Sequence, residues 1–497
     1  MDRSLGALAR ALGCSLPAPH ASTPVTGIAE DSRLAGPGYV FVAVCGGNED
    51  GRRYIGDAVS RGACAVVLEA GGSPMAGAPQ DVPALVVDDA RVALADLAAA
   101  FYGHPTRRLD VIGVTGTNGK TTTCHLLAHL LGSENCELVS TVANAERGLM
   151  GTTTPSPLAI HRLAAEALAN GRSHMVIEAS SAGVEQRRLA AVSFDAAVFT
   201  NLSDEHLPLH GGREAYFRAK LELFEALPAD SVAVVNADDA RAEAVAEVCH
   251  GRVVRFGTER GADVRVERIH EAPDSVRFGL RAGSEVEAVV LPLPGAHNVL
   301  NAAAAAAVAM ERGMALSAVA KALGDAPAVR GRGERFRTAA GTLVVVDFAH
   351  TPGALEAMIL SLRPWARRVI AVFGCSGDGD QRKYREMGRT SGRLADVTVA
   401  TTDNPKEEDP AAIAEEITAG VDEMGGYSVC CLDREEAIRD ALARAGPEDT
   451  VLIAGKGHET YQIVRGRRLE HSDGGFLTGS GLAAPIPPVC RGGHVAP

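Results

Sequence analysis

Short apolar runs alternate with amphipathic segments along most of this chain. The apolar runs have the length of β-strands and are rich in Val, Ile and Ala; they lie at residues 109–112, 173–177, 196–200, 231–236, 342–347, 369–373, 396–401 and 450–454. Between them, apolar residues recur every three to four positions, as in helices that cover a sheet; such segments lie at residues 121–131, 160–169, 214–226, 240–249 and 299–312. This alternation predicts an α/β fold with parallel sheets and helices on both faces.

The 497 residues are too many for a single hydrophobic core. We predict three domains: a small N-terminal α/β domain at 1–108, a central doubly wound domain at 109–330 and a C-terminal Rossmann-like domain at 331–473. Residues 474–497 are rich in Gly and Pro and lack periodicity, so we expect a disordered tail there.

Composition excludes several classes of protein. The net charge of −13, without a block of like charge, disfavours nucleic acid as a partner. No run is apolar over the roughly 18 residues that a membrane span needs, and the N-terminus lacks a signal pattern. The ten cysteines include no Cys-x-x-Cys pair, which favours reduced thiols. We therefore expect a cytoplasmic protein. Oligomeric state cannot be read from the sequence, and a monomer is the default expectation.

The segment from Gly113 to Thr123 carries the clearest chemistry. A β-type run leads into a glycine-rich turn, and a helical segment follows Lys120. Backbone N–H groups and the helix dipole of such a turn point at a bound phosphate. Lys120 can reach the β- and γ-phosphates, and the Thr121 hydroxyl can ligate Mg²⁺. The expected nucleotide-binding residues are Gly113, Gly116, Thr117, Asn118, Gly119, Lys120, Thr121 and Thr122. A plain strand–helix turn is the alternative; Gly-Lys-Thr at the junction argues against it.

The glycine spacing is not that of the general P-loop, because Val114 stands where that pattern has glycine. The form Gly-x-x-Gly-Thr-x-Gly-Lys-Thr, together with the segments 152–155, 178–183, 200–206 and Lys220, resembles the Mur ligases. These are ATP-dependent amide-bond enzymes of cell-wall synthesis. The relative folylpolyglutamate synthase is a weaker alternative, because an N-terminal unit with Asp31-Ser32-Arg33 belongs to the Mur pattern alone.

Three residues are expected to carry catalysis together with Lys120. Glu178 ends a strand beside the P-loop, so its carboxylate can join Thr121 around Mg²⁺; a surface glutamate is the alternative. His206 follows a strand and could ligate a second cation, although a lone loop histidine is usually only polar surface. Lys220 lies on an amphipathic segment, where a solvated lysine is the ordinary interpretation. The resemblance implies instead that Lys220 is carbamylated and becomes an anionic Mg²⁺ ligand.

The resemblance also implies substrate-binding residues. A UDP-linked muramyl acceptor would be held by Ser32, Thr153, Thr154, Ser181, Gln186 and Arg188. Asn298 and Asn301 resemble the adenine-side motif, Arg332 an interdomain arginine, and Asp347 and His350 a pair that contacts ATP. For Asp347 and His350 the alternative is turn chemistry at a strand end.

The incoming free amino acid would be held by Asp403, Asn404, Lys406, Gly455 and Glu459. Family members that add diaminopimelate carry arginine where this chain has Lys406 and Gly379. Arginine clamps a carboxylate through two parallel hydrogen bonds, whereas lysine offers a point charge. The resemblance implies a ligase that adds a diamino acid, meso-diaminopimelate by default, to UDP-MurNAc-L-Ala-D-Glu through an acyl phosphate. Two alternatives remain: a paralogue that joins another amino acid to another acid, and a nucleotide-binding protein without ligase activity.

Overall fold

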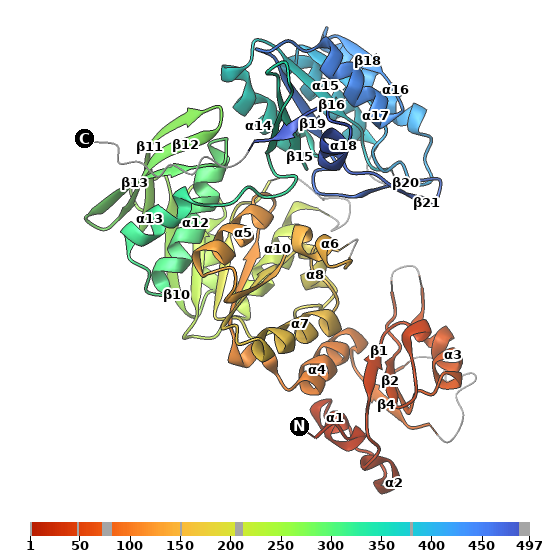
Figure 1. Ribbon diagram of the computed structural model, residues 1–497. Helices are drawn as coiled ribbons and strands as arrows, with labels where there is room; N and C mark the ends of the chain where they lie inside the picture. The colour runs from red at the N-terminus through yellow and green to blue at the C-terminus, as the bar shows by residue number, and fades with distance from the viewer. Residues whose placement is uncertain are drawn as a thin grey trace.

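The computed structural model describes residues 2–46, 49–71, 82–149, 152–203, 212–377 and 381–486. Each of the three predicted domains contains its own sheet. The N-terminal and C-terminal units lie on different sides of the central unit and are separated from each other (Figure 1).

The N-terminal unit is a four-stranded parallel sheet in the order β1 (Gly27–Ala29), β2 (Tyr39–Val42), β3 (Ala65–Glu69) and β4 (Ala84–Val87). Its helices are α1 (Leu5–Ala11), α2 (Ala18–Ala21), α3 (Ile55–Ser60) and α4 (Ala90–Tyr102). Asp89 caps α4 by accepting from the N–H groups of Arg91 and Val92. Helix α4 packs against α7 (Pro157–Ala169) of the central unit and so joins the two units (Figure 1).

The central sheet has nine strands in the order β13-β12-β11-β10-β9-β8-β5-β7-β6. The strands are β5 (Asp110–Thr115), β6 (Cys136–Val139), β7 (His174–Glu178), β8 (Ala196–Phe199), β9 (Val232–Asn236), β10 (Arg252–Gly257), β11 (Val264–Ala272), β12 (Ser275–Ala282) and β13 (Glu285–Leu291). Strands β5 to β11 are parallel, as predicted, but β12 and β13 run antiparallel. The expectation of a purely parallel sheet is wrong there, because two-residue connections between these strands permit only antiparallel pairing.

Helices cover both faces of this sheet. The central unit contains α5 (Lys120–Leu130), α6 (Thr141–Glu146), α7, α8 (Ser181–Glu185), α10 (Arg213–Glu225), α11 (Ala242–Val248), α12 (His297–Glu311) and α13 (Leu316–Gly324). Helices α5 and α12 pack on one face and α7 and α10 on the other. The alanine run of α12 is completely buried, and these small side chains let α12 lie close to α5. The predicted arrangement of two helical layers is confirmed.

The C-terminal sheet has seven strands in the order β18-β17-β16-β19-β15-β14-β22. Its first six strands along the chain are β14 (Glu334–Arg337), β15 (Leu343–Asp347), β16 (Val369–Phe373), β17 (Val397–Ala400), β18 (Ser428–Cys430) and β19 (Thr450–Ala454). Helices α14 (Pro352–Leu362), α15 (Arg382–Leu394), α16 (Pro410–Glu423) and α17 (Arg434–Arg444) cover it, and β20 (Tyr461–Val464) pairs with β21 (Arg467–Glu470) beside it. This is the predicted Rossmann-like pattern, except that β14 runs antiparallel to β15 and the edge strand β22 runs antiparallel to β14.

The expected disordered tail is wrong for residues 474–486. Helix α18 (Asp473–Gly479) packs Leu477 into the core, and β22 (Ala484–Pro485) pairs with β14. A seven-residue helix is too short to produce a recognisable period, so only its tertiary contacts reveal it. Residues 487–497 lie outside the described part of the chain. Within the described residues, no helix is long and apolar enough to cross a membrane, and every cysteine is unpaired.

Candidate active site at the P-loop

The glycine-rich turn between β5 and α5 adopts a conformation that two of its glycines make possible. Gly116 has φ of +144°, and a Cβ there would lie 1.9 Å from Thr200 Oγ1. Gly119 has φ of +85°, and a Cβ there would lie 2.2 Å from Asn301 Oδ1. Only glycine fits such backbone angles and such close neighbours. The predicted strand–loop–helix arrangement is therefore present.

Thr200 and Asn201, which follow β8, hold this loop in place through hydrogen bonds. Thr200 Oγ1 donates to Asn118 O at 2.7 Å, and Asn201 Oδ1 accepts from Asn118 N at 2.9 Å. Thr117 N donates to Asn201 O at 2.8 Å. We did not assign this bracing role from the sequence, because it depends on β8 lying directly beside β5.

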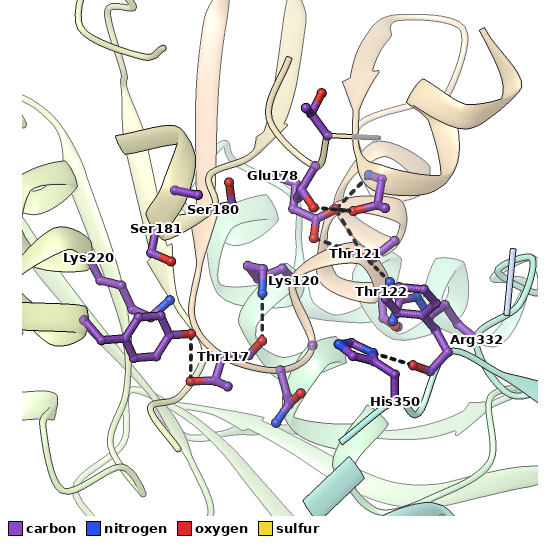
Figure 2. A pocket seen from close by; sticks show the side chains of 18 of the residues that line it. Thr117, Lys120, Thr121, Thr122, Glu178, Ser180, Ser181, Lys220, Arg332 and His350 are labelled. Atoms are coloured by element: carbon purple, nitrogen blue, oxygen red, sulfur yellow. Dashed lines mark hydrogen bonds between the residues drawn. The ribbon is translucent and has the colours of Figure 1, made fainter. Parts of the chain in front are cut away.

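Lys120 lies over the loop rather than pointing away from it (Figure 2). Its Nζ donates to Gly116 O at 3.0 Å and to Thr117 O at 2.7 Å. A phosphate in the loop would offer the ammonium a stronger, charge-assisted partner than these carbonyls. Lys120 therefore lies where the predicted contact with a phosphate would form.

Glu178, at the end of β7, is 2% exposed and faces the start of α5. Its two carboxylate oxygens accept from Thr121 Oγ1 at 3.0 and 3.1 Å. Oε2 also accepts from Thr141 N and Thr141 Oγ1, both at 2.9 Å. The predicted meeting of Glu178 and Thr121 is present, and these oxygen donors fit the preference of Mg²⁺ for one or two protein ligands beside phosphates. Thr141 was missed because nothing in its local sequence marks it.

Lys220, on α10, is 1% exposed, so the solvated-surface interpretation of this lysine is wrong. Its Nζ donates to Gly116 O at 2.8 Å and lies 4.2 Å from the centroid of the Tyr216 ring. Figure 2 shows Lys220 on the same side of the P-loop as Ser181. His206, the other expected ligand of a second cation, lies outside the described residues.

A cavity of about 490 Å³ lies in front of these groups. It is lined by four of the residues expected to hold the acceptor, Thr153, Ser181, Gln186 and Arg188, together with Lys120, Glu178 and Lys220. Thr154 is fully buried and does not line the cavity; its hydroxyl instead donates to Glu178 O at 2.8 Å. Thr154 therefore supports the Glu178 backbone.

A second cavity, of about 270 Å³, extends from Gln186 and Arg188 toward the N-terminal unit. Glu30, Val44 and Arg91 of that unit line it. Burial raises the pKa of Glu30, and hydrogen bonding to Ser156 and the charge of Arg188 oppose this rise. Ser32 lies two residues beyond Glu30 but lines neither cavity. Its hydroxyl bonds the Asp57 carboxylate, which lowers the pKa of Asp57.

A third cavity, of about 360 Å³, lies across the P-loop and is bordered by the C-terminal unit. It contains Asn298, Asn301, Asp347 and His350 beside the apolar surface of Phe256, Leu300 and Met358. Asn301 Nδ2 donates to Asn298 Oδ1 at 3.0 Å, so the two amides hold each other in place. An apolar pocket with a few oriented amides suits a nucleobase.

Arg332 lines both the first and the third of these cavities. Its Nη2 donates to Thr121 Oγ1 at 3.1 Å, and its guanidinium lies 4.5 Å from the Phe348 ring centroid. Burial lowers the pKa of Arg332, against the opposing charges of Glu178 and Asp347.

Asp347 combines two roles. It accepts from Gly333 N at 2.7 Å and Ala349 N at 2.8 Å, which is the turn chemistry that we considered. It also lines the third cavity, and burial raises the pKa of its carboxyl group. His350 similarly bonds Phe348 O at 2.8 Å while lining both cavities that flank the P-loop.

In the C-terminal unit, four of the five expected amino-acid-binding residues lie where β17 and β19 end. Asn404 Nδ2 donates to Glu459 Oε2 at 2.8 Å. An ideal Cβ on Gly455, whose φ is +102°, would lie 2.8 Å from Asp403 Oδ2. Lys406, the fifth, is half-buried beside β20, where its N–H donates to Ile463 O at 3.0 Å. The Gly379 segment lies outside the described residues.

Lys456 was not anticipated. It is completely buried, and its Nζ lies 3.0 Å from Glu459 Oε2 and 3.3 Å from both Asp403 Oδ1 and Asn404 Oδ1. Burial raises the pKa of Glu459, and the Lys456 charge opposes the rise. The flanking Gly-Lys-Gly at a strand end was the available sequence signal.

Three family models match the chain in order. They are "Mur ligase family, catalytic domain" over residues 24–102, "Mur ligase middle domain" over 114–309 and "Mur ligase, glutamate ligase domain" over 331–457. A curated relative from Geobacillus thermodenitrificans, named UDP-N-acetylmuramoyl-L-alanyl-D-glutamate–2,6-diaminopimelate ligase, is 39% identical over 87% of this chain and 90% of its own length. This chain belongs to the Mur ligase family.

Other similar proteins agree with this assignment. A relative from Roseiflexus named UDP-N-acetylmuramyl-tripeptide synthetase is 40% identical over 89% of this chain and 91% of its own length. A solved structure of a UDP-N-acetylmuramoyl-L-alanyl-D-glutamate–2,6-diaminopimelate ligase has 30% identity and a TM-score of 0.64, and covers 96% of this chain and 98% of its own. As a Mur ligase, the protein is an ATP-dependent ligase of an acid and an amino acid. The predicted family, fold and class of enzyme are thus confirmed.

Proposed function

We propose that this Mur ligase adds a diamino acid, meso-diaminopimelate by default, to UDP-MurNAc-L-Ala-D-Glu in peptidoglycan precursor synthesis. One observation carries the proposal: Lys120, Glu178 and Lys220 line the same cavity as the acceptor-binding candidates Gln186 and Arg188. The substrates in this proposal are inferred from the names of the relatives described above.

The reaction begins with phosphoryl transfer. A carboxylate oxygen of the acceptor attacks the γ-phosphorus, the bond to the β-γ bridging oxygen breaks, and ADP leaves. The Lys120 ammonium neutralises part of the negative charge that spreads over the transferring group. Bound Mg²⁺ would supply further charge neutralisation; Thr121 and Glu178 would hold one ion, and His206 and a carbamylated Lys220 a second.

The amide then forms at the acyl phosphate. The amino group of the incoming amino acid attacks the acyl carbon, and the tetrahedral intermediate collapses to amide and phosphate with loss of a proton. This amino acid is held by Asp403, Asn404, Lys406, Gly455 and Glu459. The acceptor is held by Thr153, Ser181, Gln186 and Arg188, while Ser32 and Thr154, which line neither acceptor-side cavity, support it indirectly. The outer domains close on the central one, which brings both substrates together and excludes water.

Two alternatives compete with this function. A paralogue with another acid and another amino acid is favoured by the departures at Lys406 and Gly379. A nucleotide-binding protein without ligase activity is disfavoured by the complete set of Lys120, Thr121, Glu178 and Lys220 around one cavity. Phosphate release that requires an amine separates a ligase from a binder or a simple ATPase.

The first experiment measures phosphate release with ATP, Mg²⁺ and UDP-MurNAc-L-Ala-D-Glu across a panel of amino acids that includes meso-diaminopimelate and L-lysine. We expect release with diaminopimelate and formation of the tripeptide product by mass spectrometry. ATP binding without release for any amino acid would contradict the proposal and point to another acid partner.

Replacing Lys406 by Arg is expected to lower the KM for meso-diaminopimelate about tenfold. The guanidinium would add a second charged hydrogen bond to the distal carboxylate, worth roughly 1.5 kcal/mol. Lys406 has φ of +54°, a strain that arginine and lysine share, so the backbone cost is unchanged.

L-Lysine is the matched control substrate for this variant, because it has the distal ammonium without the distal carboxylate. Its KM should stay unchanged. An equal gain for both amino acids, or no gain for diaminopimelate, would show that residue 406 does not bind that carboxylate.

A further inference from the structure

Beneath the amino-acid site lies a buried ion pair that the mechanism above does not use. Arg434 begins α17 and Asp473 begins α18, and their side chains are 1% and 0% exposed. Arg434 Nε and Nη2 donate to the two oxygens of Asp473, each at 2.8 Å. His471 Nε2 lies 2.8 Å from Asp473 Oδ1 and completes the group. We call the first two residues the Arg434–Asp473 pair.

The guanidinium also holds two backbone carbonyls. Nη2 donates to Ala454 O at 3.0 Å, and Nη1 to Thr402 O at 3.4 Å. The residues that follow these carbonyls are Gly455 and Asp403, which belong to the two loops of the amino-acid site. The Arg434 side chain therefore contacts both loops where they begin.

The sheet itself does not connect these two loops. Strand β16 lies between β17 and β19, so the ladder hydrogen bonds join each to β16 and never to each other. Within the described residues, Arg434 is the side chain that donates to carbonyls at the ends of both strands. The five donors of a guanidinium have a fixed planar geometry, which suits it to set the distance between two loops.

The charges extend this connection to the site. Burial alone would lower the pKa of Arg434, but the charge and hydrogen bonds of Asp473, followed by the charges of Asp403 and Glu459, raise it. The cation is therefore stabilised by carboxylates of the amino-acid site as well as by its own partner.

We propose that the Arg434–Asp473 pair is a positioning device that sets the spacing of the Asp403–Lys406 and Gly455–Glu459 loops and thereby the affinity for the amino acid. This inference rests on the proposed function, because it assumes that these loops bind the amino acid. Buried ion pairs contribute little net stability compared with apolar residues of similar volume. A role in geometry explains the pair better than a role in stability.

The double variant Arg434→Met with Asp473→Leu tests this role. It removes both charges of the pair together, so neither member is left buried without the other and the domain should still fold. We expect the KM for the amino acid to rise about 10- to 100-fold, the effect of misplacing binding groups by about 1 Å. The KM values for ATP and acceptor should stay within about twofold, and thermal unfolding should stay close to that of the wild-type protein.

Two single variants complete the experiment. Arg434→Lys keeps the charge but not the fork, so it should give an intermediate KM for the amino acid. Asp110→Asn is the control, because Asp110 also accepts two hydrogen bonds from one guanidinium, that of Arg312 in the central unit, at 2.6 and 2.7 Å, although this pair is about one-fifth exposed. It should lower the unfolding temperature without changing the KM for the amino acid.

The outcomes separate this inference from the proposed function. If the wild-type enzyme forms amide with diaminopimelate and the folded double variant keeps the wild-type KM, the positioning role is overturned while the function stands. Equal rises in all three KM values would also overturn it, since they indicate general loosening. A wild-type protein that forms no amide with any amino acid would instead refute the proposed function.

Discussion

Replacing Lys220 by Ala is expected to abolish amide formation, with a fall in kcat of at least about 10³-fold. The Lys220 side chain is buried against Gly116 O and the Tyr216 ring, inside the cavity that contains Lys120 and Glu178. Burying a charged ammonium at such a depth is costly, whereas a carbamate would convert the side chain into an oxygen ligand. Loss of a metal ligand removes several kcal/mol of transition-state stabilisation, and each 1.36 kcal/mol is about tenfold in rate.

Chemical rescue makes this experiment specific for the carbamate. Alanine leaves space for a short-chain carboxylic acid, so acetate or propionate should restore part of the activity of Lys220→Ala. Lys220→Arg keeps a cation, cannot be carbamylated and fills the space, so it should be inactive and refractory to rescue. Lys321→Ala, on the exposed face of α13, is the control and should behave as wild type. Full activity of Lys220→Ala would remove the carbamate from the mechanism.

Replacing Glu178 by Gln should lower kcat about 10²- to 10³-fold, the range observed when one electrostatic contact to a transition state is removed. The amide can still accept from Thr121 and Thr141, which donate to the carboxylate at 2.9 to 3.1 Å, so local folding should persist. What disappears is the negative charge beside Thr121. The Mg²⁺ concentration for half-maximal rate should therefore rise, and a Mg²⁺ titration measures both effects.

Glu137→Gln is the matched control for this second variant. Like Glu178, Glu137 is buried in the central unit; it lies on the edge strand β6. It pairs with Arg147 and Arg172 and lines none of the cavities described above. We expect lower thermal stability and an unchanged Mg²⁺ requirement. If Glu178→Gln had an unchanged Mg²⁺ requirement as well, Glu178 would be a structural residue of the loop and not a metal ligand.

Local patterns in the chain were enough to predict much of this molecule. The alternation of apolar runs and amphipathic segments predicted three α/β units. Strands buried between helices need continuous apolar residues, and the helices that cover them need apolar residues every three to four positions. The P-loop was recognisable from Gly116, Gly119, Lys120 and Thr121, because backbone angles and phosphate contacts restrict those residue types within a few positions. The antiparallel strands β12 and β13 and helix α18 were missed, since their patterns are short and acquire meaning only from the strands and core that they pack against.

Local sequence patterns were sufficient to predict the family, the fold class and the glycine-rich turn between β5 and α5. Tertiary structure alone decided that Thr141 meets Glu178, that Thr200 braces Asn118, and that Arg434 spans the loops after β17 and β19. These partners are far apart along the chain, and strand order brings them together. Strand order results from the packing of the whole domain, so no local pattern of residues records it.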